Sequence, residues 1–269
     1  VLEELKKQIG HFNLYSNLET GNLISFKRDK EVKFWCDKNS IHWLQPRQNN
    51  VIRNLDNRDL WTKHWRSFMG KSCLPPPDFN KMFFNKSDQL TNPFNILNGE
   101  SPNVFISKLK LKNQICKVPK ILLPQNPRLE ALNILKSFLY ERARDYQSGM
   151  SSPISSQDSC SRLSPYITWG VLSIREVYKE LNLAKEFWKR EHLPIREKML
   201  KNLNSFEKRL HWRCHFIQKL ETEPEIEFRC IHPHMRKLRN EYEEPDSEKF
   251  LAWKNSKTGI DFVDACMNF

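Results

Sequence analysis

The spacing of apolar residues divides this chain into a mixed first part and a helical second part. Within residues 1–70, the segments LEELKKQI, RDKEVKFWCDKN and NRDLWTKHWRSFM carry apolar residues at helical spacing, as Val32, Trp35 and Cys36 do in the second of them. The apolar runs FNLYS and IHWLQ alternate with these helices and predict strands. Alternating strands and helices are typical of a doubly wound parallel sheet, so we expect residues 1–70 to be the C-terminal half of an α/β domain.

The rest of the chain changes character twice. Residues 71–126 include CLPPPDFN and VPKILLPQN, are rich in Pro and Asn, and predict an interdomain linker. Residues 127–269 read as successive helices, so we expect an all-α domain there. The first of these helices has one apolar face, made of Leu129, Leu132, Leu135, Phe138 and Leu139.

Composition narrows the classes of partner and compartment. The chain has 269 residues and a formal net charge of +12, which favours a polyanionic partner such as DNA. Its seven cysteines are scattered and form no C-x-x-C pair, which indicates reduced thiols in a cytoplasmic protein and argues against an iron–sulfur cluster. No apolar run is long enough for a membrane span, and no signal peptide is visible. We therefore expect no membrane partner.

Two histidine pairs have spacings that a metal site could use. His211 and His215 lie four residues apart on a predicted helix, but no H-E-x-x-H pattern accompanies them. His232 and His234 lie near Cys230, and no fourth ligand follows at metal-site spacing. We interpret the first pair as helix-face residues and the second as part of a basic loop, and we predict no metal site.

The segment from Ser161 to Ser173, SRLSPYITWGVLS, is the most informative stretch of the sequence. Serine hydroxyls just before a helix that begins at Pro165 combine side-chain caps, free backbone N–H groups and the positive end of the helix dipole. Such a group of donors suits a phosphate. An ordinary capped helix is the alternative interpretation of the capping signals alone.

The full string resembles the flavin-binding signature T/C-S-x-L-S-P-Y-L-x-x-G-x-L-S of the photolyase/cryptochrome family. Two further segments resemble that family in the same order, FEKRLHWRCHF at 206–216 and WKNSKTGIDFVDACM at 253–267. Upstream, LYSNLETGN, the pair RD at 28–29, and VIRNL with NRDLW resemble the end of its N-terminal α/β domain. The resemblance implies a partial α/β domain, a linker and a partial helical FAD-binding domain. We expect both ends to be truncated relative to the family.

The resemblance also implies roles for individual residues. It assigns contacts with FAD to seven positions: Tyr146, Ser161, Arg162, Leu163, Ser164, Phe206 and Arg213. It places Arg209 and Trp212 against a pyrimidine flipped out of damaged DNA, where an aromatic wall and a polar rim are needed. It assigns no catalytic side chain within this chain.

Several positions depart from the family pattern. Arg209 replaces the Glu that hydrogen-bonds the thymine dimer, and a guanidinium only donates hydrogen bonds whereas a carboxyl accepts them. Phe206 replaces a flavin-side Trp, and Cys160, at a position where the family has Thr or Cys, lacks the hydroxyl that Thr would supply. The position of an electron-relay Trp holds Glu243, with Tyr242 beside it.

The resemblance implies a monomeric photolyase that repairs pyrimidine dimers in DNA, by electron transfer from reduced FAD under blue light. It leaves open which lesion is repaired and whether an antenna chromophore also binds. A cryptochrome-like photoreceptor with FAD but no repair activity is the alternative, and Arg209 favours it. A basic nucleic-acid-binding module without a cofactor is a third interpretation.

Overall fold

The computed structural model describes residues 2–75, 78, 126–236 and 247–268, and these residues fall into two compact units. The described residues of the first unit are 2–17, 29–46, 73–75 and 78. Those of the second are 18–28, 47–72, 126–236 and 247–268. Most of the predicted linker, residues 71–126, lies outside the described residues.

The first unit contains a β–α–β arrangement. Its elements are α1 (Leu2–Ile9), β1 (Leu14–Tyr15), the later part of α2 (Leu23–Lys38) and β2 (Trp43–Leu44). The two strands are parallel, with Leu14 opposite Trp43 and Tyr15 opposite Leu44. Parallel strands need a crossover connection, and α2 provides it. The predicted strands and helices are confirmed, but among the described residues the sheet has only these two strands, so a larger doubly wound sheet stays a prediction.

A small core and a few polar contacts hold the first unit together. Cys36 on α2 and Ile41 after it are buried. The Trp35 ring stacks on Phe12, with centroids 6.3 Å apart, and its indole N–H donates to Glu3 Oε2 at 2.8 Å. Trp35 of the periodic face predicted for α2 therefore packs toward α1 and the segment that leads from α1 to β1.

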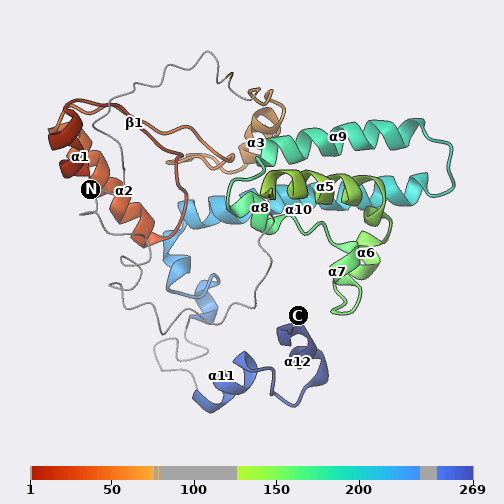
Figure 1. The fold of residues 1–269 in the computed structure, drawn as a ribbon. Coiled ribbons are helices and arrows are strands. Elements are labelled where there is room, and N and C mark those ends of the chain that lie inside the picture. The colour runs from red at the N-terminus through yellow and green to blue at the C-terminus, as the bar shows by residue number, and fades with distance from the viewer. Residues whose placement is uncertain (1, 76–77, 79–125, 237–246, 269) are drawn as a thin grey trace. The chain divides into compact units, whose positions relative to one another are not determined.

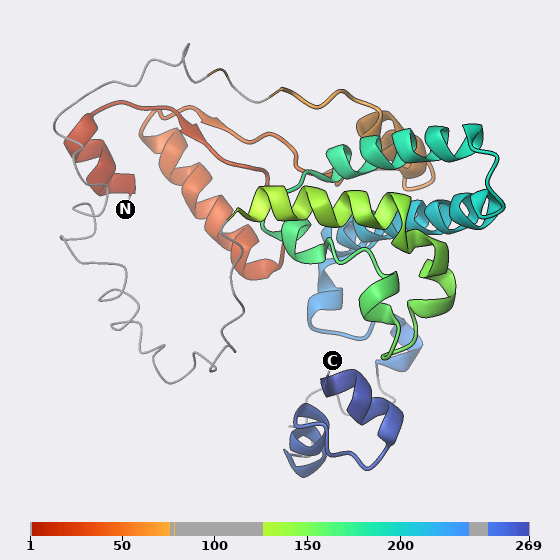
Figure 2. The same cartoon turned by 45° about the vertical axis from the view of Figure 1, so that its right-hand side comes forward.

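The second unit contains helices and no strand among its described residues from 127 onward, as predicted. Its longer helices are α3 (Trp61–Met69), α5 (Pro127–Tyr140), α9 (Ile174–Arg190) and α10 (Arg196–Thr222). Helices α5, α9 and α10 run side by side (Figures 1 and 2). Shorter elements complete it: η5 (Arg142–Asp145), α6 (Tyr146–Gly149), α7 (Ser156–Ser159), α8 (Ser164–Thr168), η6 (Pro224–Glu227), η7 (Pro233–Met235), α11 (Ser247–Lys254) and α12 (Asp261–Asn268).

Helix α3 packs in the core of the second unit, although it lies in the part of the sequence that was expected to form the α/β domain. Trp61 and Trp65 are each 2% exposed and belong to the same apolar cluster as Phe138, Leu181 and Leu203. Large aromatic side chains gain most by burial in such a cluster. Residues 47–70 therefore group with the helices in the structure, although the sequence-based division placed them in the α/β part that ends at residue 70.

The first core helix, α5, follows its predicted face except at one end. Leu135, Phe138 and Leu139 are buried, whereas Leu129 is 55% exposed. Leu129 lies in the first turn, where its amide donates to the side chain of the N-cap residue Asn126. The apolar spacing identified the helix correctly but was wrong about this first position.

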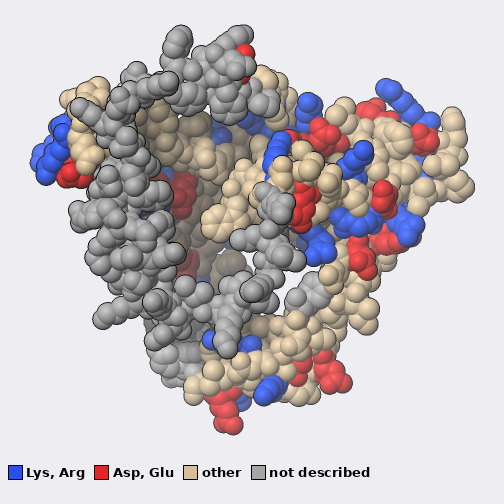
Figure 3. Space-filling model, viewed as in Figure 1, with Lys and Arg blue, Asp and Glu red and all other residues tan. Residues whose placement is uncertain are grey.

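The described residues bear on two expectations, the absence of a membrane span and the basic surface. No helix in the described ranges has the length and apolar character needed to cross a membrane. On the face shown in Figure 3, basic and acidic side chains are interleaved over the second unit's long helices. The positive net charge is therefore not gathered into one basic patch on that face.

Candidate functional site

The segment from Ser161 to Ser164 leads into α8, a helix of five residues. Arg162 and Ser164 are exposed and Ser161 is partly exposed, whereas the Leu163 side chain is 1% exposed and anchors the segment in the core. Neither serine hydroxyl has a hydrogen-bond partner among the described residues. Both hydroxyls are therefore available to a ligand.

The predicted side-chain cap of α8 is wrong. The N-cap position is occupied by Leu163, whose side chain cannot accept a hydrogen bond, and Ser164 is already the first helical residue. The final serine of the signature does act as a cap: Ser173 accepts from Arg175 N at 3.3 Å at the start of α9. A five-residue helix also sums few peptide dipoles, so donors matter more than the dipole at Ser161–Ser164.

Two features define the backbone path of this signature segment. Arg162 has φ +60°, a left-handed conformation that is unfavourable for a residue with a side chain, and Gly170 has φ +70°. Arg128 on α5 donates to Val171 O at 2.8 Å and forms an ion pair with Glu176 on α9. Strained backbone conformations of this kind persist only where surrounding contacts hold them.

On α10, Phe206 lies in an aromatic cluster with two residues of the preceding helices. The Phe206 ring is 4.8 Å from Phe138 and 6.0 Å from Tyr146 between centroids, and Tyr146 is 5.5 Å from Phe138. Tyr146 is 6% exposed and Phe206 is 4% exposed. The structure thus brings together two residues predicted separately, both as buried members of the core.

Tyr146 connects the signature segment with α10. Burial raises the pKa of its phenol, the adjacent Arg209 guanidinium opposes that rise, and Cys160 adds to it. The Tyr146 ring itself packs edge-on against Phe206 of α10, with ring centroids 6.0 Å apart. Asn202 holds the turn that carries Tyr146, because its side-chain amide accepts from Gln147 N at 3.1 Å and donates to a neighbouring carbonyl.

The two residues predicted to face DNA lie together on the surface of α10. The Arg209 guanidinium carbon is 4.9 Å from the centroid of the Trp212 ring, a cation–π contact, and Arg209 Nη2 lies 3.8 Å from Met150 Sδ. Trp212 is 50% exposed, and Phe216 packs edge-on against it. This group presents a half-exposed indole, a cation and a soft sulfur at one place.

Arg213 lies next to the group but also beside a buried thiol. Burial raises the pKa of Cys214, while the Trp65 and Arg213 side chains act in the opposite direction. Cys214 is fully buried, so it packs as an apolar residue. Arg213 is partly exposed, and its proposed contact with FAD stays a prediction.

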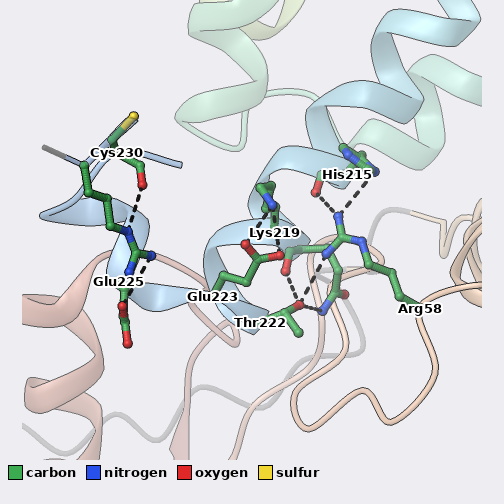
Figure 4. Close-up of polar contacts among 9 residues, drawn as sticks. Arg58, His215, Lys219, Thr222, Glu223, Glu225 and Cys230 are labelled. Atoms are coloured by element: carbon green, nitrogen blue, oxygen red, sulfur yellow. Dashed lines mark hydrogen bonds and ion pairs between the residues drawn. The ribbon is translucent and has the colours of Figure 1, made fainter. Parts of the chain in front are cut away.

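The histidine pair of α10 contacts tryptophans. His211 lies 4.9 Å from both Trp61 and Trp65 between ring centroids, and His215 lies 5.8 Å from Trp61. Figure 4 shows Arg58 reaching His215, with Arg58 Nη2 3.4 Å from His215 Nδ1. Burial lowers the pKa of both histidines, with His215 and Arg58 respectively adding to the effect. The histidines thus join α3 and the preceding loop to α10.

Within the motif at residues 253–267, hydrogen bonds to Asp264 stabilise the turn that precedes α12. Asp264 accepts from the Thr258 amide at 2.8 Å, from the Thr258 hydroxyl at 2.7 Å and from the Gly259 amide at 3.1 Å. These bonds, chiefly that from the Thr258 hydroxyl, lower the pKa of the Asp264 carboxyl. Gly259 has φ +76°, which glycine tolerates best. In the described residues this motif therefore acts as a capped turn before α12.

Sequence reasoning missed three residues that shape the site: Arg142, Met150 and Asn202. None belongs to a recognisable motif, and each acts through a partner that is distant in sequence. Only Asn202 could have been found from the sequence, because it is a polar residue at an apolar-face position of an amphipathic helix, and such a residue needs a hydrogen-bond partner when it is buried.

Comparison with known proteins finds several that resemble this chain. Residues 206–269 match the family model described as the FAD binding domain of DNA photolyase. Over 138 residues the chain is 30% identical to a deoxyribodipyrimidine photo-lyase of Alkalihalophilus pseudofirmus, an alignment that covers 51% of this chain and 25% of that protein.

A solved structure matches most of the chain. It is that of a bacterial class III photolyase from Agrobacterium tumefaciens, with a TM-score of 0.61 and 18% identity, and the match covers 99% of this chain and 52% of that one. At this identity the likeness is one of fold. The chain spans about half the length of that structure and matches a quarter of the curated relative.

Proposed function

Because this chain belongs to the photolyase/cryptochrome family, we propose that it functions in light-dependent repair of pyrimidine dimers in DNA, with reduced FAD as the electron donor. One observation carries the proposal: the cluster of Tyr146, Phe138 and Phe206 lies on one side against Arg142, which donates to Cys160 O directly before the signature segment. On the other side, Phe206 belongs to α10, the helix on which Arg209 covers Trp212. The segment proposed to hold the cofactor phosphates, Ser161–Ser164, and the pair proposed to hold a base, Arg209 and Trp212, thus lie on either side of one aromatic cluster.

The signature segment fits the diphosphate of FAD in charge and in donor type. Two unengaged serine hydroxyls, the amides of Ser164 and Tyr166, which have no acceptor among the described residues, and the exposed Arg162 guanidinium offer donors and a positive charge to phosphate oxygens. When bound, reduced FAD supplies the electron that splits the dimer. The work of these residues is to hold the diphosphate and so fix the position of the cofactor.

The aromatic cluster, together with the surface of α10 that carries Arg209 and Trp212, suits the binding of a flipped pyrimidine. Phe206, Phe138 and Tyr146 form a buried apolar wall that excludes water. Trp212 offers a half-exposed ring on which a flipped pyrimidine stacks, and Arg209 donates to the carbonyl oxygens of that base. Arg213 adds a positive charge beside this face.

A second candidate function rests on Arg209. A guanidinium cannot accept a hydrogen bond from a pyrimidine N–H, so a photoreceptor that binds FAD without repairing DNA accounts for this residue equally well. In that role Trp212 and Arg209 face a signalling partner or no partner at all.

Two measurements test the proposal. An absorption spectrum of the purified protein should show flavin bands, and their absence would remove both candidate functions in favour of a cofactor-free nucleic-acid-binding module. Light-dependent loss of dimers from an oligonucleotide then separates the two flavoprotein functions. Repair that requires both illumination and reduced flavin supports the lyase, whereas bound flavin without repair supports the photoreceptor.

A further inference from the structure

The Arg142 guanidinium ties the signature segment to the core. Arg142 begins η5, and its side chain donates to acceptors in two separate segments. On the α5 side it reaches Ser137 Oγ at 3.1 Å and Ile134 O at 3.1 Å. On the other side it reaches Asp158 O at 3.2 Å and Cys160 O, the carbonyl directly before Ser161.

The geometry of this contact needs an arginine. The guanidinium carbon lies 5.7 Å from the centroid of Phe138, so the flat group packs over the aromatic cluster while its edges donate. Burial lowers the pKa of Arg142, and the neighbouring Arg162 adds to this effect, but a guanidinium remains protonated in proteins. A lysine ammonium is a point charge on a flexible stem and cannot bridge four acceptors spread around a plane.

The neighbouring backbone leaves the signature segment little freedom. A methyl group at Gly149 would lie 2.3 Å from Ser159 Oγ, which means that α6 and α7 touch at this point. Ser159 is 4% exposed, and Leu163 is anchored in the core. Between these anchors, Arg162 adopts φ +60°. The carbonyl contacts of Arg142 therefore act on a short, strained segment whose two ends are already fixed.

We propose that Arg142 is a positioning residue for the phosphate-binding segment: by holding the carbonyls of Asp158 and Cys160, it directs the donors of Ser161–Ser164 toward an anion. This inference rests on the proposed function, because the anion is the diphosphate of FAD. Arg142 itself is turned toward the protein, since four acceptors of the protein engage its donors.

Affinities for two flavins test this role. Arg142→Ala and Arg142→Lys are compared with the unmodified chain and with Arg144→Ala, a matched control in the same helix whose exposed side chain pairs only with Asp145 among the described residues. Each protein is titrated with FAD and with riboflavin, which lacks the diphosphate. Amide hydrogen exchange of residues 160–166 is measured without flavin, with residues 177–188 of α9 as the internal reference.

We expect both Arg142 variants to bind FAD about tenfold more weakly or worse, because donors to a charged group are misdirected, and to bind riboflavin as the unmodified chain does. Exchange should quicken in 160–166 and stay unchanged in 177–188, and Arg144→Ala should change neither. Equal losses for both flavins, or unchanged exchange in 160–166, would overturn the proposal. An unmodified chain that binds no FAD would refute the proposed function instead, and the exchange data would still decide whether Arg142 fixes the segment.

Discussion

Replacing Trp212 with alanine removes the half-exposed ring of the α10 face and should reduce the affinity for damaged DNA selectively. The indole is 50% exposed, so one part of it packs on the protein and the rest is available to a base. Undamaged duplex DNA, held mainly through its phosphates, should be affected little, because its bases stay stacked inside the helix.

The size of the effect depends on Arg209, whose guanidinium covers the ring at 4.9 Å. Stacking of one base on an aromatic side chain is worth about 1–3 kcal/mol. An exposed cation–π contact is worth about 0.5–1 kcal/mol, which the base must replace if it binds the same side of the ring. Trp212→Ala should therefore weaken binding of damaged DNA by up to about 100-fold. The loss should be smallest if the base has to displace Arg209 from the ring.

The assay is binding of matched damaged and undamaged oligonucleotides across a series of salt concentrations. Phe216→Ala is the control, because Phe216 is 56% exposed and packs edge-on against Trp212 on the same helix. Arg209→Glu should weaken binding of both DNAs and flatten the salt dependence, by about 0.9 in log–log slope for each phosphate that the protein no longer neutralises. If Trp212→Ala weakens both DNAs equally, or if Phe216→Ala matches it, the stacking role of Trp212 is refuted.

The remaining predictions concern the signature segment, one close backbone contact and one carboxylate. Replacing Ser161 and Ser164 together with Ala should cost about 1–3 kcal/mol of FAD binding; flavin content after gel filtration checks this, and full retention would contradict it. Gly149→Ala puts a methyl group 2.3 Å from a buried hydroxyl and should destabilise the fold by about 1–3 kcal/mol in denaturant unfolding, whereas Gly70→Ala, whose nearest neighbour is 3.4 Å away, should change little. Because the folded pKa of Asp264 is lowered, its stabilisation of the turn before α12 is present above the unfolded pKa and lost as pH falls through the folded one. The protection factors of the amides at residues 258–259, which correct for the pH dependence of the intrinsic exchange rate, should fall in that acidic window, and protection that does not change with pH would contradict the prediction.

The sequence by itself determined the elements and the kinship of this protein. Apolar residues at helical spacing located α1, α2, α3 and α5, because a helix that buries one face must repeat apolar residues every three to four positions. Short apolar runs located β1 and β2 for the corresponding reason. Ordered motifs indicated the family, since they combine rare residue types at set spacings.

Tertiary structure alone decided which side chains meet. The partners of Arg142 lie up to 18 residues away, and Trp61 meets His211 across 150 residues, so no local pattern links them. The grouping of α3 with the helical unit was likewise invisible, because an amphipathic helix reveals that it has an apolar face but not which core receives it.

The start of α8 shows the same limit at a single residue. The serines suggested a side-chain cap, but burial of Leu163 places leucine at the N-cap and leaves both hydroxyls without a hydrogen-bond partner among the described residues. Burial of a large apolar side chain is worth about 1.5–3 kcal/mol, more than the roughly 1 kcal/mol of a cap, so packing determined where the helix begins. The sequence thus supplied the serines of the signature segment, and packing in the core determined where α8 begins.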